Sequence, residues 1–328
     1  MKTSACSLLI VVVITAAAFA VDAKPLESIE LTPASSLVFA EEEQAREVLT
    51  ADDDFSRRLS RFDLQSRLQT DQEVTRDDWR KLVAEQVTPW PAAEREKLKQ
   101  VVESLKPKLA MFRLPLPKQI LLIRTTGKEE ADAAYTRAKA IVLPAAKLRH
   151  ALPQLEALLT HELFHILSRH DATVRAALYK IVGFSVGEEI SLPQSLEDRR
   201  ITNPDAPRLD CFITLKNDGM EVTAVPILYA TPKQYDGKKG GSFFSYLTIR
   251  LLVVDKVAGQ WQPRLKDQQP VVLDPKKIDS YYEQIGRNTN YDWHPDEILA
   301  DNFVYLVNRR QNLKTPRVTE RMAEVLKP

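Results

Sequence analysis

Cysteine, glycine and long hydrophobic runs are scarce in this sequence. Its 328 residues include two cysteines and nine glycines. Cys6 lies near the N-terminus within the segment described below as a signal peptide, so Cys211 is left without a partner for an internal disulfide. A small scaffold stabilised by disulfides is therefore excluded, and the fold must depend on a hydrophobic core. We interpret Cys211 as a small buried apolar side chain rather than a reactive thiol.

The sequence also lacks an excess of charge of either sign. It has 46 Lys and Arg against 45 Asp and Glu, which gives a formal net charge of +1. A nearly neutral chain has no electrostatic footprint for nucleic acid or for an anionic membrane surface. We therefore expect neither as a partner.

The one long hydrophobic run lies at the N-terminus. It covers residues 8–20 and follows Lys2, and small residues at 18–20 and 21–23 provide cleavage-site positions. The run is shorter than the ~20 apolar residues of a membrane-spanning helix. We predict a signal peptide at residues 1–23, a secreted or periplasmic location and no stable membrane insertion after cleavage. A retained membrane anchor is the alternative.

The most informative motif contains two of the chain's five histidines. Residues 161–165 spell H-E-x-x-H. On a helix, positions i and i+4 lie one above the other, so His161 and His165 can bind one metal ion while Glu162 points towards a water molecule there. Imidazole suits zinc, and a catalytic zinc takes three protein ligands and leaves a fourth position for water. The motif predicts one Zn²⁺ with Glu162 as general base; a cluster of satisfied buried polar groups is the other interpretation.

The surroundings of this motif predict a buried helix. Apolar residues recur at spacings near 3.6 along it. They are Leu155, Leu158, Leu159, Leu163, Ile166 and Leu167.

A third protein ligand must come from elsewhere, and the best candidate is in residues 294–303, H-P-D-E-I-L-A-D-N-F. Pro295 suits the first turn of a helix. Glu297 and Asp301 then share one helix face. Glu297 could bind the metal while Asp301 accepts the outward N–H of a ligand imidazole. An acidic helix start that interacts with the helix dipole is the other interpretation.

Two further choices for the third ligand stay open. Glu188 or Glu189 lies downstream of the motif, but neither has an aspartate four residues on. Asp171 stands six residues after the second motif histidine, where a metzincin has its third ligand, with His170 one position off. Ser168 replaces the glycine that metzincins use to turn the chain.

The chain divides into a helical N-terminal region at 24–111 and a second region at 112–328. Within the first, 24–38 is predicted to be a mobile leader. The second opens with strands near 119–124 and 135–143 and later has an irregular proline-rich stretch at about 188–208. It contains a β-rich insertion at about 205–275, in which the Asn-Asp-Gly sequence at 217–219 predicts a hairpin turn. The 135–143 strand is a candidate edge along which an extended peptide could pair.

Residues 160–165, T-H-E-L-F-H, together with 297–301, E-I-L-A-D, resemble the motifs of the gluzincin metallopeptidases, the class that includes thermolysin. Residues 166–296, which are 131 in number, separate them, a longer gap than is usual in that class. The resemblance implies an α+β fold with a small mixed sheet over an active-site helix. It also implies that His161, His165 and Glu297 are the zinc ligands.

The resemblance further implies that Asp301 orients a ligand and that a tyrosine or histidine stabilises the oxyanion. Tyr291 and His294 are the nearest candidates, and Tyr281 and Tyr282 are others. The expected function is an exported zinc peptidase that acts on peptides or proteins. The alternatives are a non-catalytic zinc-binding protein of the cell envelope on a peptidase scaffold, and an enzyme held latent by its N-terminal region or its insertion.

Overall fold

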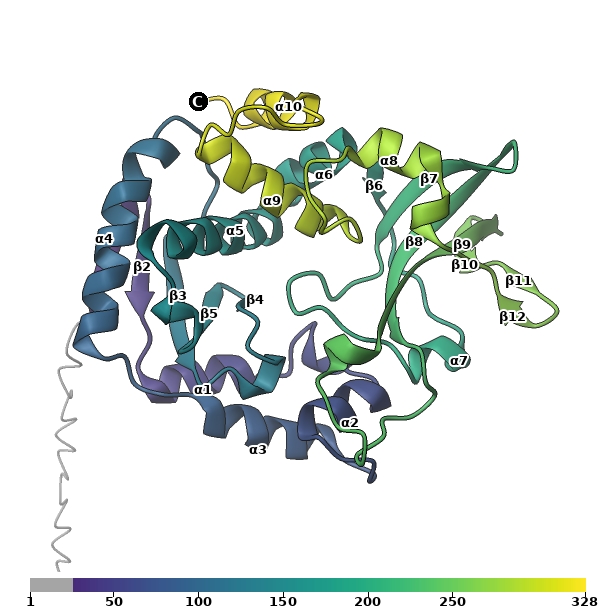
Figure 1. Cartoon of the computed structure of the whole chain (residues 1–328), viewed down its shortest axis with the longest axis horizontal. Coiled ribbons are helices and arrows are strands. Elements are labelled where there is room, and N and C mark those ends of the chain that lie inside the picture. Colours follow the sequence, from purple (N-terminus) through teal and green to yellow (C-terminus); the bar gives the residue numbers. More distant parts are fainter. Residues whose placement is uncertain (1–25) are drawn as a thin grey trace, which may run out of the picture.

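The computed structural model describes residues 26–328, so the predicted signal peptide lies outside the described part. This part is a mixed α+β fold with a five-stranded sheet, a six-stranded sheet and a two-stranded ribbon (Figure 1). The predicted α+β class is confirmed at this level. No helix within residues 26–328 is long and apolar enough to span a membrane.

The first sheet has the strand order β1-β2-β3-β5-β4. Its strands are β1 (Ser28–Thr32), β2 (Ser35–Phe39), β3 (Gln119–Thr125), β4 (Tyr135–Arg137) and β5 (Ala140–Pro144). β3 pairs in parallel with both β2 and β5, whereas β1 and β4 pair antiparallel at the two edges. Parallel strands are usually buried on both faces, and all five residues of β5 are buried here.

The N-terminal hairpin differs from expectation. We predicted a mobile leader at 24–38, but β1 and β2 occupy most of that stretch and extend the sheet. Ile29 and Leu31 are buried while Ser28 and Glu30 are exposed, which is the alternation of a strand with one buried face. The prediction was wrong because the parallel partner of β2 lies in β3, far along the chain, and local composition does not reveal it.

Four helices follow the hairpin, as the sequence predicts. They are α1 (Glu42–Thr50), α2 (Arg61–Leu68), α3 (Arg76–Gln86) and α4 (Ala92–Leu109). Ser60 and Asp63 form a capping box at the start of α2, and Thr75 and Asp78 form another at the start of α3. Each box satisfies two backbone N–H groups that a helix end otherwise leaves unpaired.

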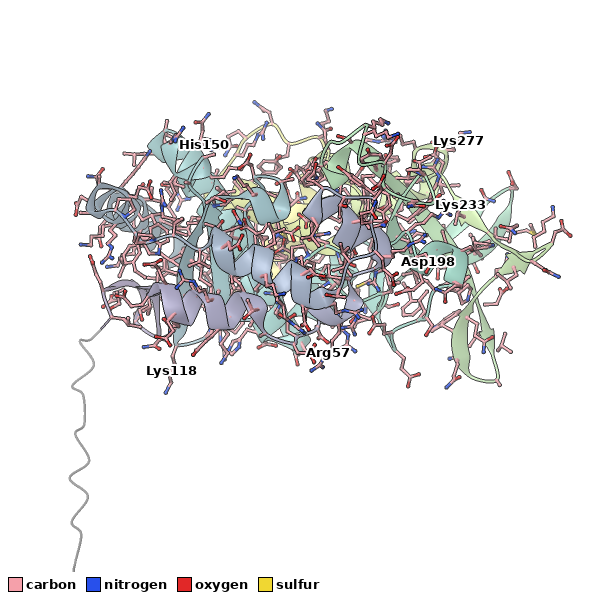
Figure 2. All side chains as sticks on the ribbon, turned by 90° about the horizontal axis from the view of Figure 1, so that it is seen from below. Arg57, Lys118, His150, Asp198, Lys233 and Lys277 are labelled. Atoms are coloured by element: carbon pink, nitrogen blue, oxygen red, sulfur yellow. The ribbon has the colours of Figure 1, made fainter. Side chains whose placement is uncertain are left out.

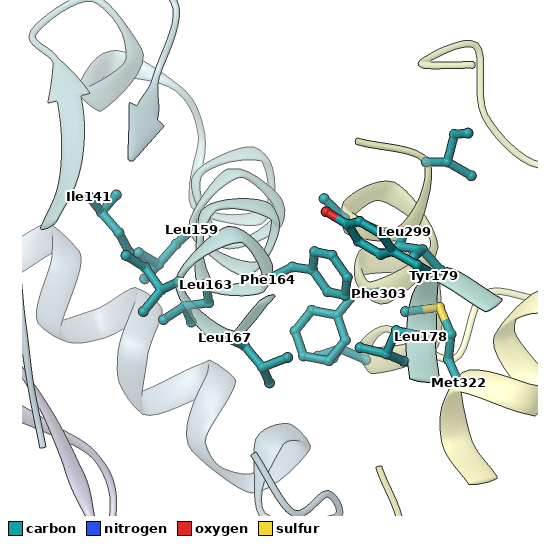
Figure 3. Close-up of a cluster of buried hydrophobic side chains, with 14 of the residues drawn as sticks. Ile141, Leu159, Leu163, Phe164, Leu167, Leu178, Tyr179, Leu299, Phe303 and Met322 are labelled. Atoms are coloured by element: carbon teal, nitrogen blue, oxygen red, sulfur yellow. The ribbon is translucent and has the colours of Figure 1, made fainter. Parts of the chain in front are cut away.

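The motif helix, α5 (Leu152–His170), lies in the middle of the main hydrophobic core. Leu159 and Leu163 lie towards Ile141 of β5, while Phe164 packs against Phe303 of α9 (Pro295–Val307), with 5.8 Å between ring centroids (Figure 3). Apolar contacts on both sides fix the orientation of α5. The predicted helices at both motifs are therefore confirmed.

The second sheet has the order β10-β9-β8-β7-β6, with β13 also paired to β9. Its strands are β6 (Phe184–Val186), β7 (Cys211–Asn217), β8 (Met220–Ala230), β9 (Leu247–Val257), β10 (Gln260–Pro263) and β13 (Val272–Leu273). Asp218 and Gly219, both with positive φ, make the two-residue turn of the β7–β8 hairpin, as predicted from the Asn-Asp-Gly sequence. Cys211 is buried, as expected.

The remaining elements of the described part are a two-stranded ribbon and four further α-helices. The two-stranded ribbon is β11 (Leu265–Lys266) with β12 (Gln269–Pro270), and the other helices are α6 (Ala172–Ile181), α7 (Gln194–Glu197), α8 (Asp279–Ile285) and α10 (Arg317–Val325). Charged side chains of both signs extend outwards from many elements, among them Arg57, Lys118 and Lys233 (Figure 2). This spread agrees with the nearly neutral net charge.

The strand predicted at 135–143 is two strands. β4 and β5 form a tight antiparallel pair in which Arg137 lies opposite Ala140. Ala138, at the turn between them, has φ of 50°, a left-handed conformation that is uncommon for a non-glycine residue. The sheet edge beside α5 is therefore the three-residue strand β4 alone.

Candidate metal centre

The two motif histidines and the motif glutamate all lie on α5, inside the fold. His161 and His165 are one turn apart, with 4.8 Å between ring centroids. The His165 side chain is 1% exposed and that of His161 is 16% exposed, while Glu162 is 3% exposed. A core helix thus presents three polar side chains to one internal point.

Helix α9 brings Glu297 to the same point. Oε2 of Glu297 lies 3.3 Å from Nε2 of His161 and 3.7 Å from Nε2 of His165. One ligand atom from each of these three residues lies within 4.8 Å of the others. The structure therefore brings together the three residues that the sequence predicted as zinc ligands.

The outward-facing nitrogens of both imidazoles meet carboxylates. Nδ1 of His161 lies 3.1 Å from Oδ1 of Asp301, and Nδ1 of His165 lies 2.6 Å from Oδ2 of Asp296. If each Nδ1–H donates to its carboxylate, the lone pair of each Nε2 faces the shared point. Asp301 takes the position predicted for it.

Asp296 was not predicted. It is 2% exposed, and it accepts hydrogen bonds from the hydroxyls of Ser168 at 2.5 Å and Tyr179 at 2.7 Å, in addition to its contact with His165. The only hint in the sequence is that Asp296 directly precedes Glu297. Neighbouring positions on a helix point about 100° apart, so local pattern does not indicate that both reach α5.

A segment before β7 supplies two more side chains to the site. Nδ2 of Asn203 donates to Oε1 of Glu297 at 2.7 Å. Asp205 accepts at Oδ1 from the backbone N–H and hydroxyl of Thr136, at 2.7 and 2.6 Å. Ligand atoms of Asp205, Glu162 and His165 also lie within 4.8 Å of one another. The sequence predicted only an irregular proline-rich stretch here, so both residues were missed.

The electrostatics of the site indicate a place for a cation. Burial, and then the charge of Asp205, raise the pKa of Glu162 to about 8. Burial opposes the charging of His165, but the Asp205 and Glu297 carboxylates outweigh it and raise its pKa to about 9. Oε2 of Glu162 is buried and has no hydrogen-bond partner among the described residues. A divalent cation bound here would compensate the negative charge of these buried carboxylates.

The donor set fits zinc. Two imidazole nitrogens and one carboxylate oxygen are the three-ligand set of one type of catalytic zinc site. Asp296 and Asp301 provide the outer carboxylates that commonly hold ligand histidines in place. The residues present would therefore accommodate one Zn²⁺.

The residues considered as alternative third ligands either form hydrogen bonds with other groups or are exposed. The Glu189 carboxylate accepts from the guanidinium of Arg58 at 2.7 Å, and Glu188 is exposed. Asp171 caps α6 by accepting from two backbone N–H groups at 2.9 Å. His170 is exposed at the end of α5.

The predicted oxyanion candidates are dispersed. The Tyr291 ring lies 6.1 Å from that of His161, and Tyr291 lines a cavity that is also lined by His161, Glu162 and Glu297. His294 instead caps α9, where its Nδ1 accepts from the backbone N–H of Asp296, and it lines a different cavity. The hydroxyls of Tyr281 and Tyr282 both donate to Asp292. Tyr291 is therefore the candidate that the structure places beside the site.

A cavity of about 680 Å³ opens onto the cluster. His161, Glu162 and Glu297 are among the residues that line it. Apolar side chains from the region of the second sheet form part of its lining: Ile201, Leu228, Phe243, Phe244 and Leu247. Pockets of this size with an apolar lining and a few convergent polar groups are typical of ligand sites.

Comparison with known proteins finds no relative of this chain. No protein-family model, curated protein or solved structure matches the chain.

Proposed function

We propose that this protein is an exported zinc-dependent peptidase of the gluzincin type. The observation that supports the proposal is the convergence of Nε2 of His161, Nε2 of His165 and Oε2 of Glu297, with Glu162 lining the same open cavity. A zinc ion in this position would polarise the scissile carbonyl and make attacking water more acidic.

The side chains around the site have distinct roles in this proposal. Glu162 accepts the proton of the attacking water, because it is buried beside the ligands and one of its oxygens has no other described partner. Asp296 and Asp301 hold the two imidazoles in one tautomer and orientation. Tyr291 supplies a phenol that can donate a hydrogen bond to the oxyanion.

The cavity also favours a class of substrate. Phe243, Phe244 and Leu247 line it on the side of the second sheet, and Phe244 is 51% exposed. Large apolar side chains gain free energy when they leave water. We infer that the substrate is a peptide with a bulky apolar residue next to the scissile bond.

Metal content is the decisive test. Purified wild type, His165→Ala and Glu297→Ala would be analysed by mass spectrometry after reconstitution with zinc. The exposed His170→Ala serves as control for loss of a histidine on the same helix. We expect one zinc in wild type and control and little in the two site variants. Wild type without zinc contradicts the proposal, and zinc retained in Glu297→Ala contradicts the assigned third ligand.

One observation favours the second candidate, a non-catalytic zinc-binding protein. A ligand atom of Asp205 lies near one of His165, which is one of the three proposed ligands, and a fourth protein ligand is typical of closed, structural zinc sites. Hydrolysis of peptides by the zinc-loaded protein would contradict this second candidate.

A further inference from the structure

Hydrogen bonds hold the segment from Thr202 to Asp205 in place at several points. Thr202 donates from its backbone N–H and its hydroxyl to the buried carboxylate of Asp63, at 3.1 and 2.7 Å. The guanidinium of Arg169 donates to the backbone carbonyl of Asp205 at 2.9 Å. The side chain of Asn203 is bound to Glu297. These contacts with the rest of the fold therefore fix the position of the segment.

The Asp205 carboxylate lies beside His165, one of the three proposed zinc ligands, and beside Glu162. Within residues 26–328, both hydrogen bonds of its side chain use Oδ1, which leaves Oδ2 available to a cation. A ligand atom of Asp205 lies within 4.8 Å of ligand atoms of His165 and Glu162. The unpartnered and buried Oε2 of Glu162 is an independent sign that a group is expected at this point.

The same segment covers a backbone donor that a substrate would use. The N–H of Thr136 belongs to the edge strand β4, whose other side is paired with β5. An extended peptide pairing with that edge would accept this N–H. Oδ1 of Asp205 already accepts it, at 2.7 Å. Asp205 thus lies where both the substrate backbone and the open zinc position are expected.

We propose that Asp205 is a displaceable fourth ligand of the zinc ion, and that the segment 202–205 holds the protein in a latent state. The inference rests on the proposed function, because it requires the three-residue zinc site. It identifies the element that keeps the enzyme latent as the segment leading into β7, not the N-terminal helices. Displacement of Asp205 frees the Thr136 N–H and the fourth position together.

The test uses the cobalt-substituted full-length protein, since Co²⁺ absorption in the visible range reports the number and kind of ligands. Wild type is compared with Asp205→Asn, which keeps an oxygen acceptor for Thr136 but removes the charge. Asp279→Asn makes the same change at an exposed residue at the start of α8, which does not line the cavity. Circular dichroism verifies folding, and Thr136→Val, which removes one of the two bonds that hold Asp205, provides a second variant.

We expect the Asp205→Asn spectrum to change intensity and to become pH-dependent, because an opened fourth position admits solvent. Zinc affinity, measured by chelator competition, should fall at least about tenfold. Hydrolysis of a peptide with an apolar residue should rise in Asp205→Asn and, to a smaller extent, in Thr136→Val. Asp279→Asn should match wild type in all three measurements.

The outcomes separate this inference from the proposed function. An Asp205→Asn spectrum and affinity equal to those of metal-loaded wild type would overturn the inference and leave the zinc site intact. A changed spectrum without hydrolysis in any variant supports Asp205 as a ligand and contradicts the peptidase. A wild type that binds no metal overturns both.

Discussion

His165 and Asp296 lie 131 positions apart in the sequence, and yet Nδ1 of the histidine is 2.6 Å from Oδ2 of the aspartate. The contact joins α5 to α9 at the centre of the fold. Asp296 is itself held by Ser168 and Tyr179, so the imidazole has one preferred orientation, with Nε2 facing Glu297. Metal binding should therefore depend on residues that never contact the metal.

Asp296→Asn tests this dependence. The amide is a weaker acceptor for the imidazole N–H, so zinc affinity should fall by about 10- to 100-fold while the fold is kept. Chelator competition measures the affinity. Asp279→Asn, at an exposed helix start, is the matched control; equal affinities for the two variants would show that the Asp296 contact does not support the site.

Glu162→Gln separates catalysis from metal binding. The amide keeps the size of the side chain but cannot accept the proton of water, so the rate of peptide hydrolysis should fall by about 10² to 10⁴. Zinc content, measured by mass spectrometry, should stay at the wild-type level because Glu162 is not a proposed ligand. Full activity in this variant would rule out Glu162 as the general base.

Phe303→Ala tests the packing that holds α9 against α5. Phe303 is 1% exposed and contacts Phe164, so its loss should lower the free energy of unfolding by about 3–5 kcal/mol. Urea denaturation of the zinc-loaded protein measures the change. Phe244→Ala is the control, because Phe244 is 51% exposed and its loss should change stability by about 0.5 kcal/mol or less.

The two phenylalanines should also differ in function. Phe244→Ala is expected to raise KM for peptides with a bulky apolar residue, because it removes apolar surface from the cavity. A KM unchanged by Phe244→Ala argues against the assigned substrate class, and a Phe303→Ala protein as stable as the control argues against the packing account.

Glu129 should make stability depend on pH. Burial raises its pKa to about 7 in the folded protein, from an ordinary value of 4.5. Between these values the folded state binds more protons than the unfolded state, so stability falls as pH rises from about 4.5 to 7, by a total on the order of 3 kcal/mol. Below about pH 4.5 this loss is absent.

Glu129→Gln should remove that part of the pH dependence and raise the stability at neutral pH. The difference in unfolding free energy between wild type and variant, measured across pH 4 to about 8 by urea denaturation, isolates Glu129 from other titrating groups. Glu103→Gln, an exposed glutamate, should give a flat difference. A flat difference for Glu129→Gln as well would contradict the predicted shift.

Local sequence pattern was sufficient to predict structure that depends on a single helix or turn. The helical spacing of Leu155, Leu159 and Leu163 predicted α5, and the position of Pro295 predicted the start of α9. The Asn-Asp-Gly turn predicted the β7–β8 hairpin. In each case the determining forces, apolar periodicity and backbone conformation, act over a few residues.

Local pattern failed where the partner is distant. Residues 28–39 form strands because β2 pairs with β3, and the 135–143 stretch divides because the chain turns at Ala138. Asp296, Asn203 and Asp205 reach the site from segments with no motif of their own. Their positions result from the packing of α9 on α5 and from the hydrogen bonds that hold residues 202–205 in place.

The sequence by itself determined which candidate side chains share one helix: the i and i+4 histidines with the glutamate between them on α5, and Glu297 with Asp301 on α9. Helix geometry sets those relations within a turn or two. Only the tertiary structure decided that the two helices meet, that Asp296 contacts His165, and that Asp205 lies beside His165 and Glu162. Those contacts join residues far apart in the chain, and long-range packing, not local spacing, brings them within bonding distance.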